Sequence, residues 1–239
     1  MSGIVIALDG PSGSGKSTVG RYLANSRGLG YLDTGAMFRA LAWFCHDRGV
    51  DLEDLEAVAD ASASFPLVIT LDPASTRVLV GDADVTEDIR TTEISTVVSK
   101  VATNLGVRAS LKARQRAIIA RELTPDGYSM GRGIVAEGRD ITTVIAPDAD
   151  VRILLVAREE ARLARRALEL HGSDDDDAIA ATRDQVLRRD ADDSTVSEFS
   201  EAADGVITLD SSTLTLEETL NAATAVVERQ LARNAGARG

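Results

Sequence analysis

The chain has 239 residues, of which 44% are hydrophobic and 27% charged. This balance is typical of a globular protein with one hydrophobic core. The formal net charge of −12 repels nucleic-acid phosphates, so we expect no DNA or RNA partner. The single cysteine, Cys45, excludes an internal disulfide, and no apolar run reaches the length of a membrane span. The first apolar run starts at Ile4 without a basic leader, so we expect a cytoplasmic protein without a membrane partner.

The first quarter of the chain alternates between strand-length apolar runs and helical patterns. Residues 4–8 form a continuous apolar run that ends in a Gly-Pro turn, which is typical of a buried strand. A helix is expected over 16–27, because Gly28 is a common helix stop. The elements expected next are a strand at 31–32, a helix capped by Asp33 or Thr34, and a short helix at 51–61.

The pattern changes after Phe65. Two β-rich runs, 67–71 and 77–80, flank a turn-like segment at 72–75, which predicts a small antiparallel insert. Further helices are expected at 93–103, 108–123, 159–170, 178–189 and from 216 onward, with strands at 134–136, 151–156 and 206–209. The acidic run 174–177 is expected to be a solvated loop or a helix start. This alternation predicts an α/β fold of three layers, in which helices cover both faces of a mostly parallel sheet.

A complete phosphate-binding loop (P-loop) lies between the first strand and the first helix. Residues 10–17, Gly-Pro-Ser-Gly-Ser-Gly-Lys-Ser, match the pattern G-x-x-x-x-G-K-[ST] at every required position. Its glycines let backbone N–H groups point at phosphate oxygens, and the helix N-terminus adds further donors. Lys16 supplies a charge to the β and γ phosphates, and the Ser17 hydroxyl is placed to bind Mg²⁺. The motif predicts nucleoside triphosphate binding and leaves the phosphate acceptor open.

Three classes of P-loop protein differ in the features expected in the rest of the chain. A GTPase should carry Asn-Lys-x-Asp, which is absent from the sequence. A motor or transport ATPase should have a strand that ends in an acid, whereas the apolar run 151–156 ends in Ala157-Arg158. A small-molecule kinase needs an arginine-rich lid that excludes water. Arginines at helical spacing that fit such a lid are Arg158, Arg162, Arg165, Arg166, Arg183, Arg188 and Arg189. The alternative is a solvated charged face paired with acids such as Glu159.

Several further segments recur in a family of known kinases. They are Asp9 with the P-loop, the run Leu-Asp-Thr-Gly-Ala-Met-Phe-Arg at 32–39, the end of the insert at 81–91, Gly138-Arg139-Asp140, the Ala-Pro-Asp-Ala run at 146–149, and Arg188-Arg189-Asp190 with Asp193-Ser194. In order and spacing, they resemble the bacterial cytidylate (CMP) kinases, which are P-loop nucleoside monophosphate kinases. The resemblance covers about residues 4 to 230.

The resemblance implies phosphoryl transfer from ATP to CMP or dCMP with Mg²⁺, by a monomer. It implies catalytic roles for Lys16, Arg39, Arg139 and Arg162. For ATP it implies Gly10, Pro11, Ser12, Gly13, Ser14, Gly15, Lys16, Ser17, Thr18, Arg158 and Arg166, with Ser17 also at the metal. For the acceptor it implies Thr34, Arg39, Ser99, Arg108, Arg139, Asp140, Arg189 and Asp193. Of these, Ser99, Arg108 and Asp140 would read cytosine, whose amine is a donor and whose carbonyl is an acceptor.

The resemblance also implies how the chain is divided into domains, and the sequence differs from the family pattern at two positions. We expect a P-loop core at 1–64, 96–157 and 194–239, a β-rich monophosphate-binding insert at 65–95, and an arginine-rich lid at 158–193. Val196 stands where the family often has an arginine, and Thr142 where it often has a glycine. The alternatives are a kinase for another acceptor (UMP, AMP or a shikimate-like molecule) and a module that binds ATP without transferring its phosphate.

Overall fold

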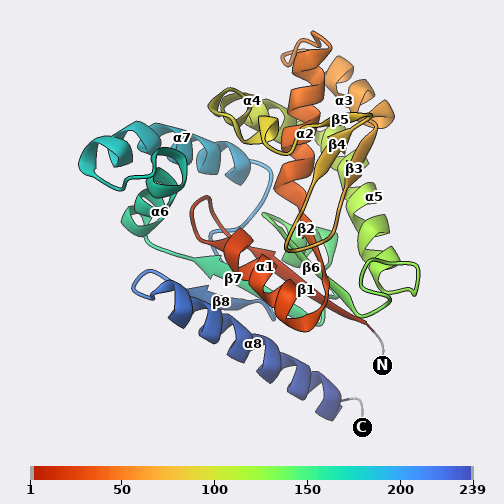
Figure 1. Cartoon of the computed structure of the whole chain (residues 1–239), viewed down its shortest axis with the longest axis vertical. Coiled ribbons are helices and arrows are strands. Elements are labelled where there is room, and N and C mark those ends of the chain that lie inside the picture. The colour runs from red at the N-terminus through yellow and green to blue at the C-terminus, as the bar shows by residue number, and fades with distance from the viewer. Residues whose placement is uncertain (1–2, 238–239) are drawn as a thin grey trace.

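A five-stranded parallel sheet forms the centre of this computed structural model, which describes residues 3–237 (Figure 1). In spatial order the strands are β2 (Gly30–Asp33), β6 (Gly133–Gly138), β1 (Ile4–Asp9), β7 (Val151–Val156) and β8 (Ile207–Asp210). The predicted mostly parallel sheet is therefore confirmed. Because β1 lies in the middle of the sheet, the loop that follows it emerges at the centre of the carboxyl edge.

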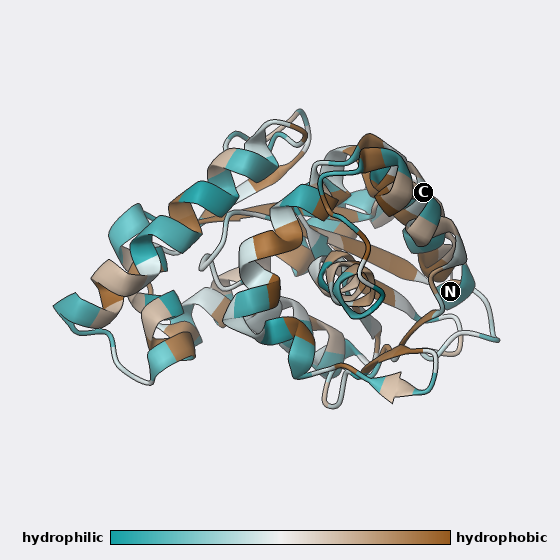
Figure 2. Cartoon of the chain, turned by 90° about the horizontal axis from the view of Figure 1, so that it is seen from above, coloured by the Kyte–Doolittle hydropathy of each residue, from teal (hydrophilic) through white to brown (hydrophobic). Residues whose placement is uncertain are grey.

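Helices cover both faces of the sheet, which explains the continuous apolar run of β1. Val5 and Ala7 pack on one face with α2 (Thr34–Asp47) and α5 (Leu105–Glu122). Ile6 and Leu8 pack on the other face with α1 (Lys16–Arg27) and α8 (Leu216–Ala237). Figure 2 shows that the helices carry apolar segments in alternation with hydrophilic ones. The three layers predicted from the sequence are present, because a strand buried on both faces needs apolar side chains in both directions.

The insert forms a second, antiparallel sheet. Its strands are β3 (Leu67–Ile69), β4 (Val78–Val80) and β5 (Ala83–Asp84). The first two confirm the expected pair, and the sequence analysis missed the third. Val78, Val80 and Val85 join the hydrophobic cluster that contains α2, so the insert packs directly on the core. A short 3₁₀ helix, η1 (Asp88–Arg90), and α4 (Thr92–Ala102) follow it.

The short helix before the insert is displaced from its expected position. It spans Leu55–Ser64 (α3) rather than 51–61. Asp51 and Asp54 are both potential N-caps, but the Asp54 carboxylate accepts two backbone amides of the first helical turn. Asp51 instead accepts an amide in a separate turn. The choice between two similar capping residues therefore decided where the helix begins.

A helical hairpin of α6 (Glu159–His171) and α7 (Asp176–Ser194) stands beside the sheet, at the left of Figure 1. The Asp175 side chain accepts the amide of Ala178 and caps α7, which confirms the acidic run as a helix start. A π-helical turn, η2 (Ile141–Ile145), follows β6 and was not predicted. Within residues 3–237, no helix has the length and apolar character needed to cross a bilayer.

Candidate active site

The P-loop runs from the end of β1 into α1. Gly13 and Gly15 adopt positive φ angles of 74° and 94°, which favour glycine. A Cβ on Gly13 would lie 2.4 Å from the carbonyl oxygen of Arg162, so glycine also allows α6 to approach the loop. Gly15 occupies the N-cap of α1. The first-turn N–H groups of α1 therefore face the loop without a side-chain cap.

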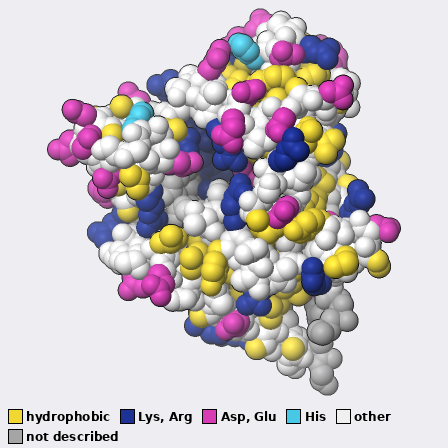
Figure 3. Space-filling view, in the orientation of Figure 1, with side chains coloured by type: hydrophobic (Ala, Val, Ile, Leu, Met, Phe, Trp, Pro, Cys, Tyr) yellow, Lys and Arg dark blue, Asp and Glu magenta, His cyan; other side chains and the backbone are white. Residues whose placement is uncertain are grey.

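The P-loop borders a cavity of about 480 Å³ at the carboxyl edge of the sheet. From the loop and α1, Ser12, Gly13, Gly15, Lys16, Ser17 and Thr18 line it. Of the other expected loop residues, Gly10 and Pro11 lie beside the lining and Ser14 is completely buried. Figure 3 shows the hollow between the helical hairpin and the rest of the molecule, with basic side chains inside it. The cavity therefore combines backbone N–H donors with cationic side chains.

Lys16 is held inside this cavity. Its Nζ donates to the carbonyl oxygen of Pro11 at 2.8 Å. Burial, followed by the positive charge of Arg139, lowers the pKa of Lys16 to about 8. The negative charges of Glu137 and Asp190 offset only part of this effect, so the ammonium is well suited to bind an anionic ligand.

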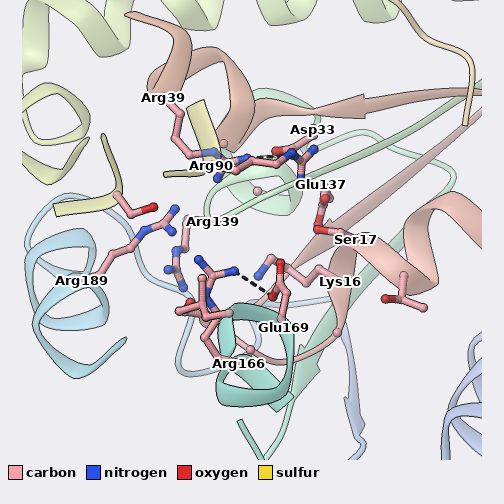
Figure 4. Close-up of a pocket in the computed structure, with 18 of the residues that line it drawn as sticks. Lys16, Ser17, Asp33, Arg39, Arg90, Glu137, Arg139, Arg166, Glu169 and Arg189 are labelled. Carbon is pink, nitrogen blue, oxygen red and sulfur yellow. Dashed lines mark hydrogen bonds and ion pairs between the residues drawn. The ribbon is translucent and has the colours of Figure 1, made fainter. Parts of the chain in front are cut away.

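Arginines from five segments converge on the same cavity. They are Arg39 of α2, Arg90 of η1, Arg139 after β6, Arg166 of α6 and Arg189 of α7 (Figure 4). Burial, followed by the charge of Arg139, lowers the pKa of Arg189 to about 10. The Nε of Arg39 is buried and has no hydrogen-bond partner among residues 3–237. Such a concentration of guanidinium groups favours ligands with several negative charges.

Two acids that the sequence analysis did not assign to the site face these cations. Asp33 ends β2 and Glu137 lies next to the end of β6, and the two are register partners in the sheet. Both line the cavity, and Figure 4 shows Glu137 close to Ser17. Burial and the negative charge of Asp33 raise the pKa of Glu137. Its Oε1 accepts the hydroxyl of Tyr31, while Oε2 is buried without a partner among residues 3–237.

Asp33 has two functions in the local structure. Its side chain accepts the amide of Ala36 and caps α2, and it forms an ion pair with Arg39 at 3.0 Å. Burial opposes ionisation of Asp33, but Arg39 and the Ala36 amide outweigh it, so the pKa lies below its usual value. The expected cap at Asp33 is confirmed. An apolar run followed by an acid, at 134–137, was the signal that could have revealed Glu137.

Acids on α7 join the hairpin to the P-loop and to Arg139. Asp190 accepts the amide of Ser12 at 3.0 Å and pairs with Arg139 at 3.0 Å. Arg162 also pairs with Asp190 and donates to the carbonyl oxygen of Ser12 at 2.9 Å. Asp193 is buried and pairs with Arg139 at 2.9 Å. Arg162 and Asp193 therefore adjoin the cavity and contact residues that line it.

The remaining expected residues lie around the cavity at different depths. Thr34 is buried and donates to the carbonyl oxygen of Glu137 at 2.7 Å. Arg108 pairs with Asp140 and donates to Ser197 at 2.8 Å. Ser99 lies on α4 outside the described lining, whereas Ser95, one helical turn earlier, lines the cavity. Arg158 is exposed at the N-cap of α6, also outside that lining.

Comparison with known proteins identifies the family of the chain. The family model described as cytidylate kinase matches residues 6–229. The cytidylate kinase of Cutibacterium acnes is 46% identical, over 92% of this chain and 94% of that protein. The cytidylate kinase of Rhodococcus opacus is 42% identical, over 96% of this chain and 96% of that protein. The cytidylate kinase of Streptomyces griseus is 40% identical, over 95% of this chain and 94% of that protein. The chain belongs to the cytidylate kinase family.

Proposed function

We propose that the protein transfers the terminal phosphoryl group of ATP to CMP or dCMP, with ADP and CDP or dCDP as products. The observation that carries this proposal is the cavity, where the P-loop meets a cluster of arginines at the edge of the sheet. Both reactants carry phosphate charges and repel each other in water. A family of cytidylate kinases supplies the acceptor class, and the cations of the cavity supply the means to bring the two anions together.

On the donor side, the backbone N–H groups of residues 10–18 would hold the ATP phosphates, with Lys16 on the β and γ phosphates. Arg162 contacts the P-loop directly and Arg166 lines the cavity, so both are placed to approach the transferred group. Arg158 is expected to join them when the lid, residues 158–193, moves toward the phosphates. Closure of this segment would exclude water, which would otherwise accept the phosphoryl group.

On the acceptor side, Arg39, Arg139 and Arg189 line the cavity. We assign Arg39 and Arg139 to the acceptor phosphate, Arg189 and Asp193 to its ribose side, and Thr34 to the adjoining wall. Position 196, where the family often has an arginine, is a valine in this chain. Arg90 lines the cavity from the insert, and we assign to it the cationic contact that Val196 does not provide.

The cytosine base would be read by Ser99, Arg108 and Asp140. Arg108 and Asp140 pair with each other and lie next to Ser197. A carboxylate can accept the exocyclic amine of cytosine, and a guanidinium can donate to its carbonyl. Uracil has a carbonyl in place of the amine, so Asp140 would discriminate against it. In this assignment the core comprises 1–64, 96–157 and 194–239 and the insert 65–95, with residues 1, 2, 238 and 239 outside the described structure.

The residues around Ser17 fit Mg²⁺. The metal prefers oxygen ligands, and it often keeps several of its waters. Ser17, Asp33 and Glu137 line one side of the cavity, and Glu137 Oε2 is buried without a partner among the described residues. Ser17 would bind the metal directly, with Glu137 and Asp33 held to it through water. Mg²⁺ bound there would screen the phosphate charges.

The reaction needs neither a general base nor a covalent intermediate on the protein. An acceptor phosphate oxygen is already ionised near neutral pH and can attack the γ phosphorus in line with the leaving ADP oxygen. Lys16, Arg39 and Arg139 would stabilise the charge that spreads over the transferred group. Transfer is therefore achieved by positioning and electrostatics.

An acceptor panel tests the proposal. Purified protein with MgATP is assayed for ADP release with CMP, dCMP, UMP, AMP and shikimate as separate acceptors. We expect kcat/KM to be highest for CMP or dCMP. A higher value for another acceptor would reassign the substrate, and ATP binding without acceptor-dependent ADP release would indicate a nucleotide-binding module.

A further inference from the structure

A buried carboxylate beside the P-loop has no role in the reaction described above. Asp9 is the last residue of β1 and only 1% exposed. It accepts the amides of Ile141 and Thr142 at 2.9 and 2.7 Å, and the hydroxyl of Thr142 at 2.6 Å. Burial disfavours the charged carboxylate and raises the pKa of Asp9, and these donors offset only part of that cost. Asp9 is therefore committed to one short segment, η2, that follows Gly138-Arg139-Asp140.

The position of Asp9 connects the two halves of the proposed site. It directly precedes Gly10, the first residue of the P-loop, and its register partner in β6 is Gly138. Arg139 adds a second connection, because its Nη1 donates to the carbonyl oxygen of Gly10 at 3.2 Å. Arg139 therefore contacts the start of the P-loop on one side of Asp140, and Ile141 and Thr142 contact Asp9 on the other side. These contacts hold the acceptor-binding segment against the P-loop.

Thr142 contributes more to this contact than a glycine at the same position would. A glycine would supply only the backbone amide, whereas the buried Thr142 supplies an amide and a hydroxyl. Its neighbour Thr143 is partly exposed, and its side chain has no hydrogen-bond partner among residues 3–237. The two adjacent threonines therefore offer a matched pair for experiment.

We propose that Asp9 and Thr142 are positioning residues for the acceptor. They hold Arg139 and Asp140 at the distance from the P-loop that phosphoryl transfer to a cytosine nucleotide requires. The proposal rests on the proposed function, because it takes the acceptor roles of Arg139 and Asp140 from there. Catalysis by positioning is sensitive to displacements of about 1 Å, so a looser η2 weakens acceptor binding and base discrimination. The P-loop keeps its own supports in α1 and Asp190, so ATP binding is preserved.

The test uses three variants. Thr142→Val removes the hydroxyl at nearly equal size, and Thr142→Ser keeps the hydroxyl. Thr143→Val is the control. We measure kcat and the KM values for CMP and ATP, the ratio of kcat/KM for CMP over UMP, and the Tm. Loss of one hydrogen bond to a buried carboxylate is expected to raise the KM for CMP by ~10-fold in Thr142→Val. The CMP over UMP ratio falls several-fold, while the KM for ATP stays within about twofold. Thr142→Ser and Thr143→Val behave like the wild type.

The outcomes separate this proposal from the proposed function. A wild type that releases no ADP with CMP overturns the proposed function and this role with it. An active wild type whose Thr142→Val variant retains its KM for CMP and its base preference overturns this role alone. A lower Tm with unchanged KM values, or equal rises in the KM for CMP and for ATP, also overturns it, because either result indicates a purely structural contact. Should the valine variant fail to fold, Thr142→Ala removes the same hydroxyl without added bulk and is read in the same way.

Discussion

Replacement of Lys16 by methionine should stabilise the protein while it abolishes phosphoryl transfer. Lys16 is charged at neutral pH, yet burial and the nearby Arg139 lower its pKa from 10.5 to about 8. The folded state therefore resists the charge that the reaction needs. Methionine has a similar length and no charge, so Lys16→Met removes this unfavourable charge together with the contact to the ATP phosphates.

The size of the effect follows from three quantities. A pKa shift from 10.5 to about 8 corresponds to ~3 kcal/mol of lost stability below pH 8. Loss of the hydrogen bond from Nζ to Pro11 subtracts about 1 kcal/mol from the gain. The Lys16 side chain is only partly buried. Solvent therefore screens its charge and reduces the net gain in stability further. We expect Lys16→Met to be more stable than the wild type by ~1–2 kcal/mol at pH 7.

The pH dependence distinguishes this cause from better packing. The pKa of Lys16 is lower in the folded than in the unfolded state, so the unfolded state binds more protons between these values. The stability of the wild type therefore rises relative to Lys16→Met as the pH increases from about 8 toward 10.5. The gap between the variants should be widest below pH 8 and should close near pH 10.5. Other groups titrate in both proteins, so they cancel in the difference.

Urea unfolding of both proteins at pH 7 and pH 10 measures this gap, with ADP release as the activity assay. Lys100→Met is the control, because Lys100 is an exposed lysine paired with Glu53. It should change stability by less than about 0.5 kcal/mol at either pH. A Lys16→Met protein that is less stable than the wild type at pH 7 would refute the reasoning. A gap of the same size at both pH values would do so as well.

Two further substitutions test the proposed acceptor site and the proposed metal site. Arg39→Ala should lower kcat by several orders of magnitude and leave the ATP dissociation constant unchanged, because Arg39 faces the proposed acceptor site. Near-normal turnover of this variant would show that the acceptor phosphate binds elsewhere. Glu137→Gln should raise the Mg²⁺ concentration for half-maximal activity by ~10-fold, and should weaken MgATP binding more than binding of metal-free ATP. Equal effects on the two forms of ATP, measured by calorimetry, would contradict a role of Glu137 at the metal.

Parts of the fold and site could be predicted where they depend on neighbouring residues. The P-loop was identified because its residues are contiguous and lie between a strand and a helix pattern. The parallel sheet followed from alternating strands and helices. Helix α3 was misplaced because Asp51 and Asp54 are equally good caps in sequence terms, and only the structure shows Asp54 at the helix N-terminus.

Glu137 was not predicted, because the longer apolar run at 151–156 was the more obvious strand. The run at 151–156 is longer than the run at 134–136, and it ends without an acid. In the structure both runs are strands next to β1, and the shorter one, β6, carries Glu137 into the cavity. Strand length gave no information about which strand ends beside the P-loop.

By itself the sequence determined the nucleotide-binding loop, the layered α/β architecture and the family resemblance, because these depend on local motifs and on the periodicity of apolar residues. Only the tertiary structure decided which charges meet. The order β2, β6, β1 places Asp33 beside Glu137, and the packing of α7 brings Asp190 to Ser12 and Arg139. Strand order and helix packing join residues that are distant in the chain, and no local pattern records those contacts.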